Sequence, residues 1–295
     1  MKKVYIAGCG GMLGEAFYKA FKNDYECKFT DKDVNSDWLN FLDFRDISAY
    51  ENDVKSFAPD ILIHLGAYTS LEYCDTNEMD ALNNNVTSLE TAVHLSNDLD
   101  IPLLFISTAG IFDGEKDEYD DWDASGPLGV YARTKVLAED YITKNANKYF
   151  VMRAGWMMGG GPAKDKKFVG KIINQLVDGK KELFIVDDKD GTPTYTHDFA
   201  AVAKKLINTN RYGVYNCVCE GLTSRLEVAH EIVKLLNLES DVKITEVSSE
   251  YFSSEYFSLR PPSERLVNKK LQIIGLNSMR DWKVALKEYI DEYWQ

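Results

Sequence analysis

Two residues that can transfer a proton, Tyr131 and Lys135, stand four positions apart in the segment YARTK. On a helix this spacing places both side chains on one face, one turn apart. A free tyrosine has a pKa of about 10, and a nearby ammonium group lowers that value by stabilising the phenolate. Such a pair can give a proton at neutral pH. Tyr18 and Lys22 have the same spacing, so the elements around each pair must distinguish a site from a surface pair.

The segment IPLLFIST indicates a buried strand that ends at Ser107 and Thr108. Ligands of doubly wound sheets gather at the carboxyl ends of the strands. We therefore expect Thr108 to face Tyr131 and Lys135, which begin the next expected helix. A hydroxyl group there can hold a carbonyl oxygen while the tyrosine protonates it and the carbon receives a hydride. The three residues predict the reduction of a carbonyl group.

A glycine-rich turn, AGCGGMLGEAF, follows the first expected strand and opens a helix. Its glycines, Gly8, Gly11 and Gly14, let the backbone turn tightly and approach a pyrophosphate. The start of the helix, at Met12 and Leu13, presents free N–H groups and a partial positive charge to that group. The turn therefore predicts dinucleotide binding.

Asp31 ends the second expected strand, where a carboxylate can accept hydrogen bonds from the adenosine ribose and repel a 2′-phosphate. Lys32 beside it would soften that repulsion, and a purely structural role for Asp31 as a turn cap is the alternative. Asp43 and Phe44 are expected to flank the adenine. The expected cofactor is NAD or NADP, with NAD favoured by Asp31.

The other tyrosine–lysine pair belongs to the helix that follows the glycine turn. Tyr18 and Lys22 lie beyond the first turn of that helix, too far along it to face a nicotinamide ring. We expect them to form a partly solvated helix face with no catalytic role.

Short apolar runs alternate with longer amphipathic ones through the first two-thirds of the chain. Continuous apolar strands separated by helices indicate a parallel sheet covered on both faces, with right-handed crossovers. The sequence predicts an α/β fold, a Rossmann-type doubly wound parallel sheet with a smaller C-terminal substrate-binding lobe. Strands are expected at residues 3–8, 27–31, 60–67, 101–108 and 148–156, and helices at 12–22, 79–95, 128–145, 224–238 and 282–294.

Near residue 159 the regular alternation of short apolar and longer amphipathic runs ends. We expect a dinucleotide-binding Rossmann domain over residues 1–158 and a smaller substrate-binding lobe over 159–295, with segments near 190–218 returning to the first domain. The segment GGGPAKDKK has the composition of a mobile loop. Ser224 and Glu227 are expected to form a capping box at a helix start.

Composition narrows the class of partner. The chain has 295 residues, a net charge of −13 and 45% hydrophobic residues. This charge argues against nucleic acid and anionic membranes as partners. The apolar runs are shorter than the roughly 20 residues that span a bilayer, and the N-terminus lacks an apolar core of signal-peptide length. We expect a cytoplasmic protein.

The five cysteines and four histidines show no metal-binding spacing, so no metal site is predicted. Cys217 and Cys219 lie in the segment CVC. We expect both to be buried thiols on one face of a strand.

Taken in order, several segments resemble the extended short-chain dehydrogenase/reductases, and specifically the dTDP-4-dehydrorhamnose reductase family. The resemblance covers nearly the whole chain. It rests on the glycine turn, HLGAYTSLEYCD, Asn85 in NNNV, ISTAGIFDG, Tyr131 with Lys135, RAGWMMG, DDKDGTPTYTHDFA and RPPSERLVNKKL. The resemblance implies that NADH or NADPH gives a hydride to the 4-keto group of a nucleotide-linked deoxysugar.

The resemblance also implies a role for each site residue. Tyr131 would be the general acid, Lys135 would lower its pKa and hold the nicotinamide ribose, and Thr108 would bind the ketone oxygen. Asn85 would support the helix and a proton-relay water. Trp156 would contact the sugar.

Cations are expected near the substrate diphosphate. Arg260, the first residue of the Arg-Pro segment, is the expected ligand of that group. Lys164, Lys166 and Lys167 would either contribute to binding or belong to a solvated loop. Relatives often form dimers, so a homodimer is a possible state.

The sequence departs from the family pattern at two places. Ala109 and Gly110 stand where the family usually has an acid and an aromatic residue after Ser-Thr. Related dehydratases use an Asp-Glu pair there, so dehydration is not expected. In the Arg-Pro segment, Glu264 and Val267 replace the family's usual Ser and Asp. An extra carboxylate near a diphosphate is unfavourable, so the substrate is expected to be either the rhamnose precursor or another nucleotide-linked 4-keto sugar.

Two other functions fit the same residues. A nucleotide-sugar epimerase of the extended family would use the same three side chains with a cofactor that stays bound. A non-catalytic dinucleotide-binding regulatory subunit would keep the fold alone. The complete set of Thr108, Tyr131 and Lys135 favours an enzyme.

Overall fold

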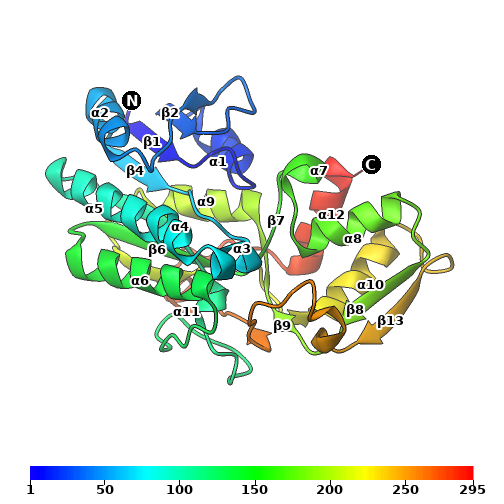
Figure 1. The fold of residues 1–295 in the computed structure, drawn as a ribbon. Coiled ribbons are helices and arrows are strands. Elements are labelled where there is room, and N and C mark those ends of the chain that lie inside the picture. Colours follow the sequence, from blue (N-terminus) through cyan, green and yellow to red (C-terminus); the bar gives the residue numbers. More distant parts are fainter. Residues whose placement is uncertain (295) are drawn as a thin grey trace.

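The central element of this computed structural model, which describes residues 1–294, is a parallel sheet. Within those residues it has seven strands in the order β11-β6-β5-β4-β1-β2-β3 (Figure 1). The strands are β1 Lys3–Ala7, β2 Glu26–Asp31, β3 Asn40–Phe41, β4 Ile61–His64, β5 Leu103–Thr108, β6 Tyr149–Ala154 and β11 Gly213–Asn216. The strand order reverses between β1 and β4, which creates the place where ligands of doubly wound sheets bind. The predicted Rossmann-type α/β fold is confirmed.

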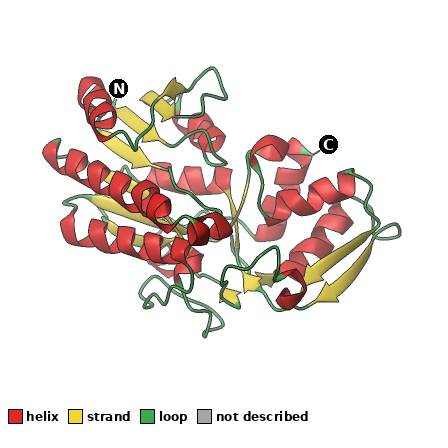
Figure 2. Ribbon diagram, in the orientation of Figure 1, coloured by secondary structure: helices red, strands yellow, loops and turns green. Residues whose placement is uncertain are grey.

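Helices cover both faces of this sheet (Figure 2). One face packs against α1 Gly14–Phe21 and α9 Thr196–Leu206, and the other against α2 Ile47–Phe57, α5 Ser88–Asp98 and α6 Val130–Asn145. Successive residues of a strand point to opposite faces. Accordingly, Ile6 of β1 belongs to the first core, whereas Tyr5 and Ala7 belong to the second.

The connection from β4 to α5 carries several short helical turns. These are α3 Leu71–Thr76, α4 Glu78–Leu82 and the π-helical turn η1 Asn83–Thr87, and a 3-10 turn, η2 Ala109–Ile111, follows β5. The helix predicted at 79–95 is therefore present as α4, η1 and α5, which follow one another without a gap. The hydrogen-bond pattern changes from α-helical to π-helical at η1. π-Turns of this kind concentrate at functional sites.

The second half of the chain forms a smaller lobe. It contains a parallel pair, β8 Glu182–Val186 and β13 Lys243–Val247, and the elements α7 Gly161–Lys164, α8 Phe168–Val177, α10 Arg225–Leu235, η3 Ser249–Phe252 and α12 Trp282–Tyr293. α11 Lys269–Ile273 instead packs against β11 of the main sheet. Ser224 and Glu227 form the predicted capping box at the start of α10. The segment predicted as a mobile loop differs, because residues 161–164 form α7.

Short strands join the two halves. β7 Trp156–Met158 pairs with β10 Pro193–Tyr195, and β9 Asp190–Gly191 pairs with β12 Thr223–Ser224 and β14 Ser263–Glu264. These pairings bring the Arg-Pro segment beside Trp156. β11 lies next to β6 in the main sheet, so the chain does re-enter the first half after residue 190, and the domain boundaries stay a prediction.

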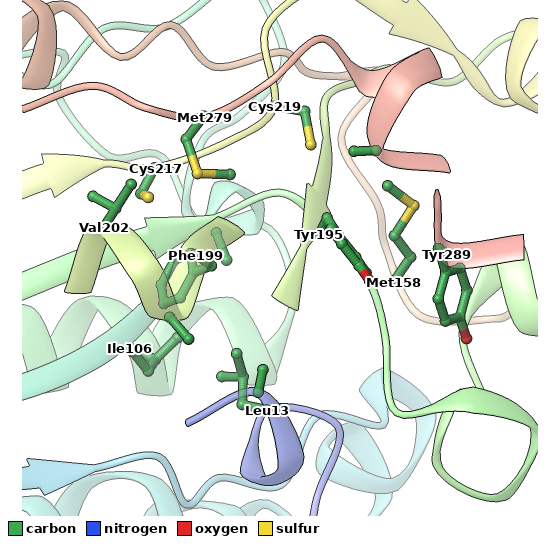
Figure 3. Packing of buried hydrophobic residues seen from close by; sticks show 14 of the residues in the cluster. Leu13, Ile106, Met158, Tyr195, Phe199, Val202, Cys217, Cys219, Met279 and Tyr289 are labelled. Carbon is green, nitrogen blue, oxygen red and sulfur yellow. The ribbon is translucent and has the colours of Figure 1, made fainter. Parts of the chain in front are cut away.

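One hydrophobic core continues from the first half into the second. Figure 3 shows Tyr195 between Leu13, Ile106 and Phe199 on one side and Tyr289 on the other, all members of this core. Cys217 and Cys219 are buried in this core, as expected, but they do not lie in a strand, because β11 ends at Asn216.

In residues 1–294, no helix combines the length and the apolar character that crossing a bilayer requires. The same residues contain no group of three or more His, Cys, Asp or Glu side chains placed to hold a metal ion.

Candidate active site

The glycine turn is pressed against the end of β4. Gly8 has a φ of +85°, and a Cβ on it would lie 2.3 Å from the Gly66 nitrogen. Only glycine fits this combination of conformation and contact. At Gly11, by contrast, no heavy atom of the described residues lies within 4 Å of the position of a Cβ. The turn is therefore closed on the strand side and open at the start of α1, where a phosphate group can approach.

The side chains beside this opening have structural contacts of their own. Leu13 is buried in the main core, so only its backbone is available to a ligand. Asp31 accepts hydrogen bonds from the backbone nitrogens of Gly10, at 2.8 Å, and Asp33, at 2.9 Å. Asp31 thus caps the turn, which was the alternative reading, and its contact with a ribose stays a prediction. Met12 is partly exposed.

The predicted adenine neighbours are both engaged with protein groups. Asp43 forms an ion pair with Arg45 at 2.6 Å, and this guanidinium group lowers the pKa of the Asp43 carboxyl. Phe44 is buried, and its ring lies edge-on to the ring of His64 with centroids 4.9 Å apart. Contact of either residue with adenine stays a prediction.

Two cations stand near Asp31. Lys32 and Arg45 both donate to the hydroxyl of Tyr68, at 3.3 and 3.0 Å. Arg45 is paired with Asp43, and Lys32 follows Asp31 directly in the chain, so the choice between NAD and NADP stays a prediction.

The hydroxyls of Thr108 and Tyr131 lie together, as predicted from the strand end and the helix start. Thr108 ends β5, and its Oγ1 accepts a hydrogen bond from the Gly110 nitrogen at 3.2 Å. Burial raises the pKa of Tyr131, and a hydrogen bond with Thr108 opposes that rise. The direction is opposite to the predicted lowering, because desolvation disfavours the phenolate.

Lys135 is buried one turn further along α6, and its ammonium group points to β5. Its Nζ donates to the Ile106 carbonyl at 2.6 Å and lies 4.1 Å from the centre of the Phe105 ring. Burial lowers the pKa of Lys135 to about 7. Its expected roles, lowering the pKa of Tyr131 and holding the ribose, stay predictions.

Asn85 is buried in η1 and joins two parts of the site. Its Oδ1 accepts from the Tyr68 nitrogen at 2.7 Å, and its Nδ2 donates to the Tyr68 carbonyl at 3.1 Å and to Thr134 Oγ1 at 3.0 Å. Thr134 lies between Tyr131 and Lys135 on α6. Asn85 therefore positions the helix that carries both residues.

Trp156 lies at the boundary between the two halves, in contact with charged groups of the second. Its Nε1 donates to Glu264 Oε2 at 2.8 Å. The guanidinium carbon of Arg225 lies 5.2 Å from the Trp156 ring centre and 5.1 Å from that of Phe168. Within residues 1–294 the Nε of Arg225 is buried without a hydrogen-bond partner.

Arg260 is already paired. Its NH2 donates to Glu72 at 2.6 Å, and its NH1 donates to the Ser258 carbonyl at 2.9 Å. It nevertheless belongs to a group of cations, because its charge contributes to lowering the pKa of Lys167, Lys189 and Arg225, after the larger effect of burial. An anion beside this group would relieve that repulsion.

The basic segment at 164–167 makes contacts across the two halves rather than forming a fully solvated loop. Lys164 donates to the Gly10 carbonyl of the glycine turn. Lys167 donates to the Thr69 carbonyl at 2.8 Å, whereas Lys166 is exposed and donates to Pro162. Two of the three lysines thus contact the first half of the chain, and their part in ligand binding stays a prediction.

The other tyrosine–lysine pair has no site around it. Tyr18 stacks on Trp38 with ring centres 4.6 Å apart, and the Lys22 ammonium lies 4.6 Å from the centre of the Tyr18 ring. Tyr18 and Lys22 therefore form a partly solvated helix face, as expected.

Sequence reasoning missed the contacts that Arg225 and Glu264 make with Trp156. The capping box predicted the helix start, but nothing in the sequence indicated that the first residue of α10, Arg225, would reach Trp156. Glu264 was expected near a diphosphate, whereas it contacts Trp156 and lies beside Gly110. Both contacts depend on pairing between β9, β12 and β14.

Comparisons of the sequence and of the structure with known proteins found relatives that match nearly the whole chain. The family model described as "RmlD substrate binding domain" matches residues 1–295. The spore coat polysaccharide biosynthesis protein SpsK of Bacillus subtilis is 29% identical, over 99% of this chain and 98% of its own length. A dTDP-4-dehydrorhamnose reductase from Bacillus anthracis, solved in complex with NADP, is 27% identical with a TM-score of 0.90 and covers 99% of each chain. A dTDP-4-dehydrorhamnose reductase ortholog from Clostridium acetobutylicum is 30% identical with a TM-score of 0.88 and covers 98% of each chain.

Proposed function

Because this chain belongs to the RmlD substrate binding domain family along its whole length, we propose that it is an NAD(P)H-dependent reductase of a nucleotide-linked 4-keto-deoxysugar. The solved relative from Bacillus anthracis is a dTDP-4-dehydrorhamnose reductase that binds NADP. The single observation that carries the proposal is the meeting of the Thr108 and Tyr131 hydroxyls at the carboxyl end of β5. A ketone needs this pair, a hydrogen-bond partner and a proton donor, when it becomes an alcohol.

In the proposed reaction the dinucleotide supplies a hydride to the ketone carbon. Thr108 holds the ketone oxygen, and Tyr131 gives that oxygen a proton as negative charge develops on it. Lys135, whose pKa burial lowers to about 7, stands one helical turn away to support the tyrosine and the nicotinamide ribose. Asn85 keeps α6 in register with the end of β4 through Tyr68 and Thr134.

The sugar and its diphosphate would bind between the two halves. Trp156 offers an aromatic surface to the sugar ring. Arg260, with Lys167 nearby, offers positive charge to the diphosphate. Since Arg260 is paired with Glu72, we propose that the anion shares this guanidinium group with the carboxylate.

The dinucleotide would lie over the glycine turn, with Gly8, Gly11 and the backbone of Met12 and Leu13 at its pyrophosphate. Asp31 favours NAD, whereas Lys32, which follows it directly in the chain, would soften its repulsion of a 2′-phosphate. Comparing kcat/KM for NADH and NADPH measures this preference. A lower value for NADPH supports the role proposed for Asp31.

The decisive experiment is a screen of dTDP-linked 4-keto-6-deoxysugars with NADH and NADPH, followed by absorbance of the reduced cofactor. A reductase consumes one cofactor molecule for each sugar. An epimerase leaves the reduced cofactor unchanged while its sugar changes configuration.

Tyr131→Phe tests the proton donor. We expect kcat to fall by about 10²-fold or more, because general acid catalysis supplies rate factors of this size. KM for the sugar should change little. Tyr141→Phe, on the exposed side of α6 near His94, is the matched control. Unchanged turnover in Tyr131→Phe would contradict the catalytic proposal and favour a dinucleotide-binding regulatory subunit.

A further inference from the structure

Glu264 lies at the sugar end of the proposed site. It belongs to β14 and is paired in register with Gly191 of β9. A Cβ on Gly191 would lie 2.3 Å from the Trp156 ring, so the missing side chain allows the indole to lie close to β9. There the indole Nε1 donates to Glu264 Oε2 at 2.8 Å. One carboxylate oxygen is therefore fixed by Trp156.

The other oxygen of Glu264 faces Thr108 and Gly110. A Cβ on Gly110 would lie 3.3 Å from Glu264 Oε1 and 3.5 Å from Thr108 Oγ1. The two oxygens therefore border the same small space, which is left by the absent side chain of Gly110. Among residues 1–294, no donor is hydrogen-bonded to Glu264 Oε1, so this oxygen is available to a ligand.

Nearby cations make a carboxylate compatible with an anionic nucleotide sugar. Burial lowers the pKa of both Arg225 and Lys189, and the charge of Glu264 opposes that effect at each. Tyr131 also faces Glu264, whose charge adds slightly to the rise that burial causes in the tyrosine pKa. Glu264 therefore touches the reacting end of the site while its charge is balanced by the second half.

We propose that Glu264 selects the substrate, its Oε1 accepting a hydrogen bond from a hydroxyl or amino group on the sugar carbon next to the reacting carbonyl. This inference rests on the proposed function, which places the ketone oxygen at Thr108. A sugar that bears hydrogen at this carbon leaves the carboxylate unpaired. A sugar that bears a carboxylate there is repelled.

Binding of dTDP-4-keto-6-deoxyhexoses with a hydroxyl, an amino group or hydrogen at carbon 3 tests this selection. Calorimetry without reduced cofactor gives Kd for each, and turnover with NADH or NADPH is measured in parallel. The wild-type protein should prefer a donor group to hydrogen by about tenfold, as expected for a hydrogen bond to a charged acceptor. Glu264→Ala should bind all three sugars alike. A stronger preference for the amino sugar would identify an ammonium group as the natural donor.

Two variants separate selection from a merely structural role. Trp156→Phe removes the hydrogen bond that fixes Oε2 and should weaken the preference for a donor without abolishing it, because the carboxylate itself remains. Glu246→Ala, at an exposed position on β13, is the matched control and should behave as the wild type. An equal preference in Glu264→Ala and the wild type would overturn the inference. Donor-selective binding that Glu264→Ala loses, without turnover of any sugar, would uphold it and refute the reductase.

A substitution at Gly110 gives an independent test. Gly110 has no positive φ, so alanine is conformationally permitted there. Its methyl group would make a tight contact with Glu264 Oε1, at 3.3 Å, and an ordinary contact with Thr108 Oγ1, at 3.5 Å. Gly110→Ala should weaken binding of the hydroxyl sugar in the wild type but have less effect in a Glu264→Ala background. Additive effects on Kd would contradict a shared space.

Discussion

Lys135 lies at the position that the spacing predicted, but its ammonium group contacts β5 instead of the Tyr131 hydroxyl. Spacing on a helix determines the position of the Cα atom. The end of a long, flexible lysine side chain is positioned by the groups around it. The Ile106 carbonyl and the Phe105 ring supply those contacts. Because the site is buried, the charged form of Lys135 is disfavoured relative to the unfolded chain.

This burial predicts a pH-dependent stability. The folded pKa of Lys135 is about 7, below its ordinary value of 10.5. Between these values the unfolded chain binds more protons at this residue, so the free energy of unfolding gains from Lys135 as pH rises through the window. Lys135→Met should remove this gain. Urea unfolding at several pH values between about 7 and 10.5 measures it.

The matched control is Lys144→Met, because Lys144 lies on the same helix and is exposed beside Asp140. Its pH profile should follow that of the wild type. If Lys135→Met and Lys144→Met gave parallel profiles, burial would not govern the protonation of Lys135.

Glu264 shows what sequence alone could not predict at the residue scale. Its departure from the family pattern was visible, as were Ala109 and Gly110. The sequence did not indicate that these departures meet in space, because residues 110 and 264 come together only through the small strands between the halves. A carboxylate of the second half therefore lies beside Gly110, although no acid follows Thr108 in the sequence.

At the scale of elements, the long apolar strands and amphipathic helices of the first half were predictable from pattern. β5 begins and ends within two residues of its expected bounds, and α6 likewise. β3 was not predicted, because it has two exposed residues and no apolar pattern. β9, β12 and β14 are equally short, and only their neighbours define them.

Asn85 provides a test of how one element positions another. Asn85→Ala removes three hydrogen bonds and leaves the Tyr68 backbone and Thr134 without their buried partner. We expect a loss of about 1–3 kcal/mol in the free energy of unfolding, as for buried unpaired polar groups. Because α6 carries Tyr131, kcat should fall as well. Urea unfolding and steady-state kinetics measure the two effects.

Asn83→Ala is the control for this change, since Asn83 lies in the same π-turn and is exposed. It should alter neither quantity. A stable Asn85→Ala protein with full kcat would show that η1 does not position α6.

At the scale of the molecule, the two halves share a core and a group of cations. Leu13 at the start of α1 and Ile172 of α8 belong to one hydrophobic cluster. The net charge is −13, yet Arg260 lies close enough to Lys167, Lys189 and Arg225 for its charge to add to the lowering of their pKa values that burial causes. An acidic chain that gathers cations at one place repels anions generally and attracts them there. The net charge could be predicted from composition. The closeness of these cationic side chains could not, because they come from separate segments that the fold brings together.

This charge arrangement predicts a salt-dependent affinity for the nucleotide sugar. Salt screens charges over about 10 Å at 0.1 M and about 3 Å at 1 M, so KM for the sugar should rise as NaCl is added. Lys167→Ala should raise that KM by about tenfold at low salt, as expected for a lost hydrogen bond to a charged group, and by less at high salt. Lys166→Ala, at the exposed neighbouring position, should leave KM unchanged. Since Lys167 also donates to Thr69, the salt dependence separates the two roles: a purely structural contact would raise KM equally at every salt concentration.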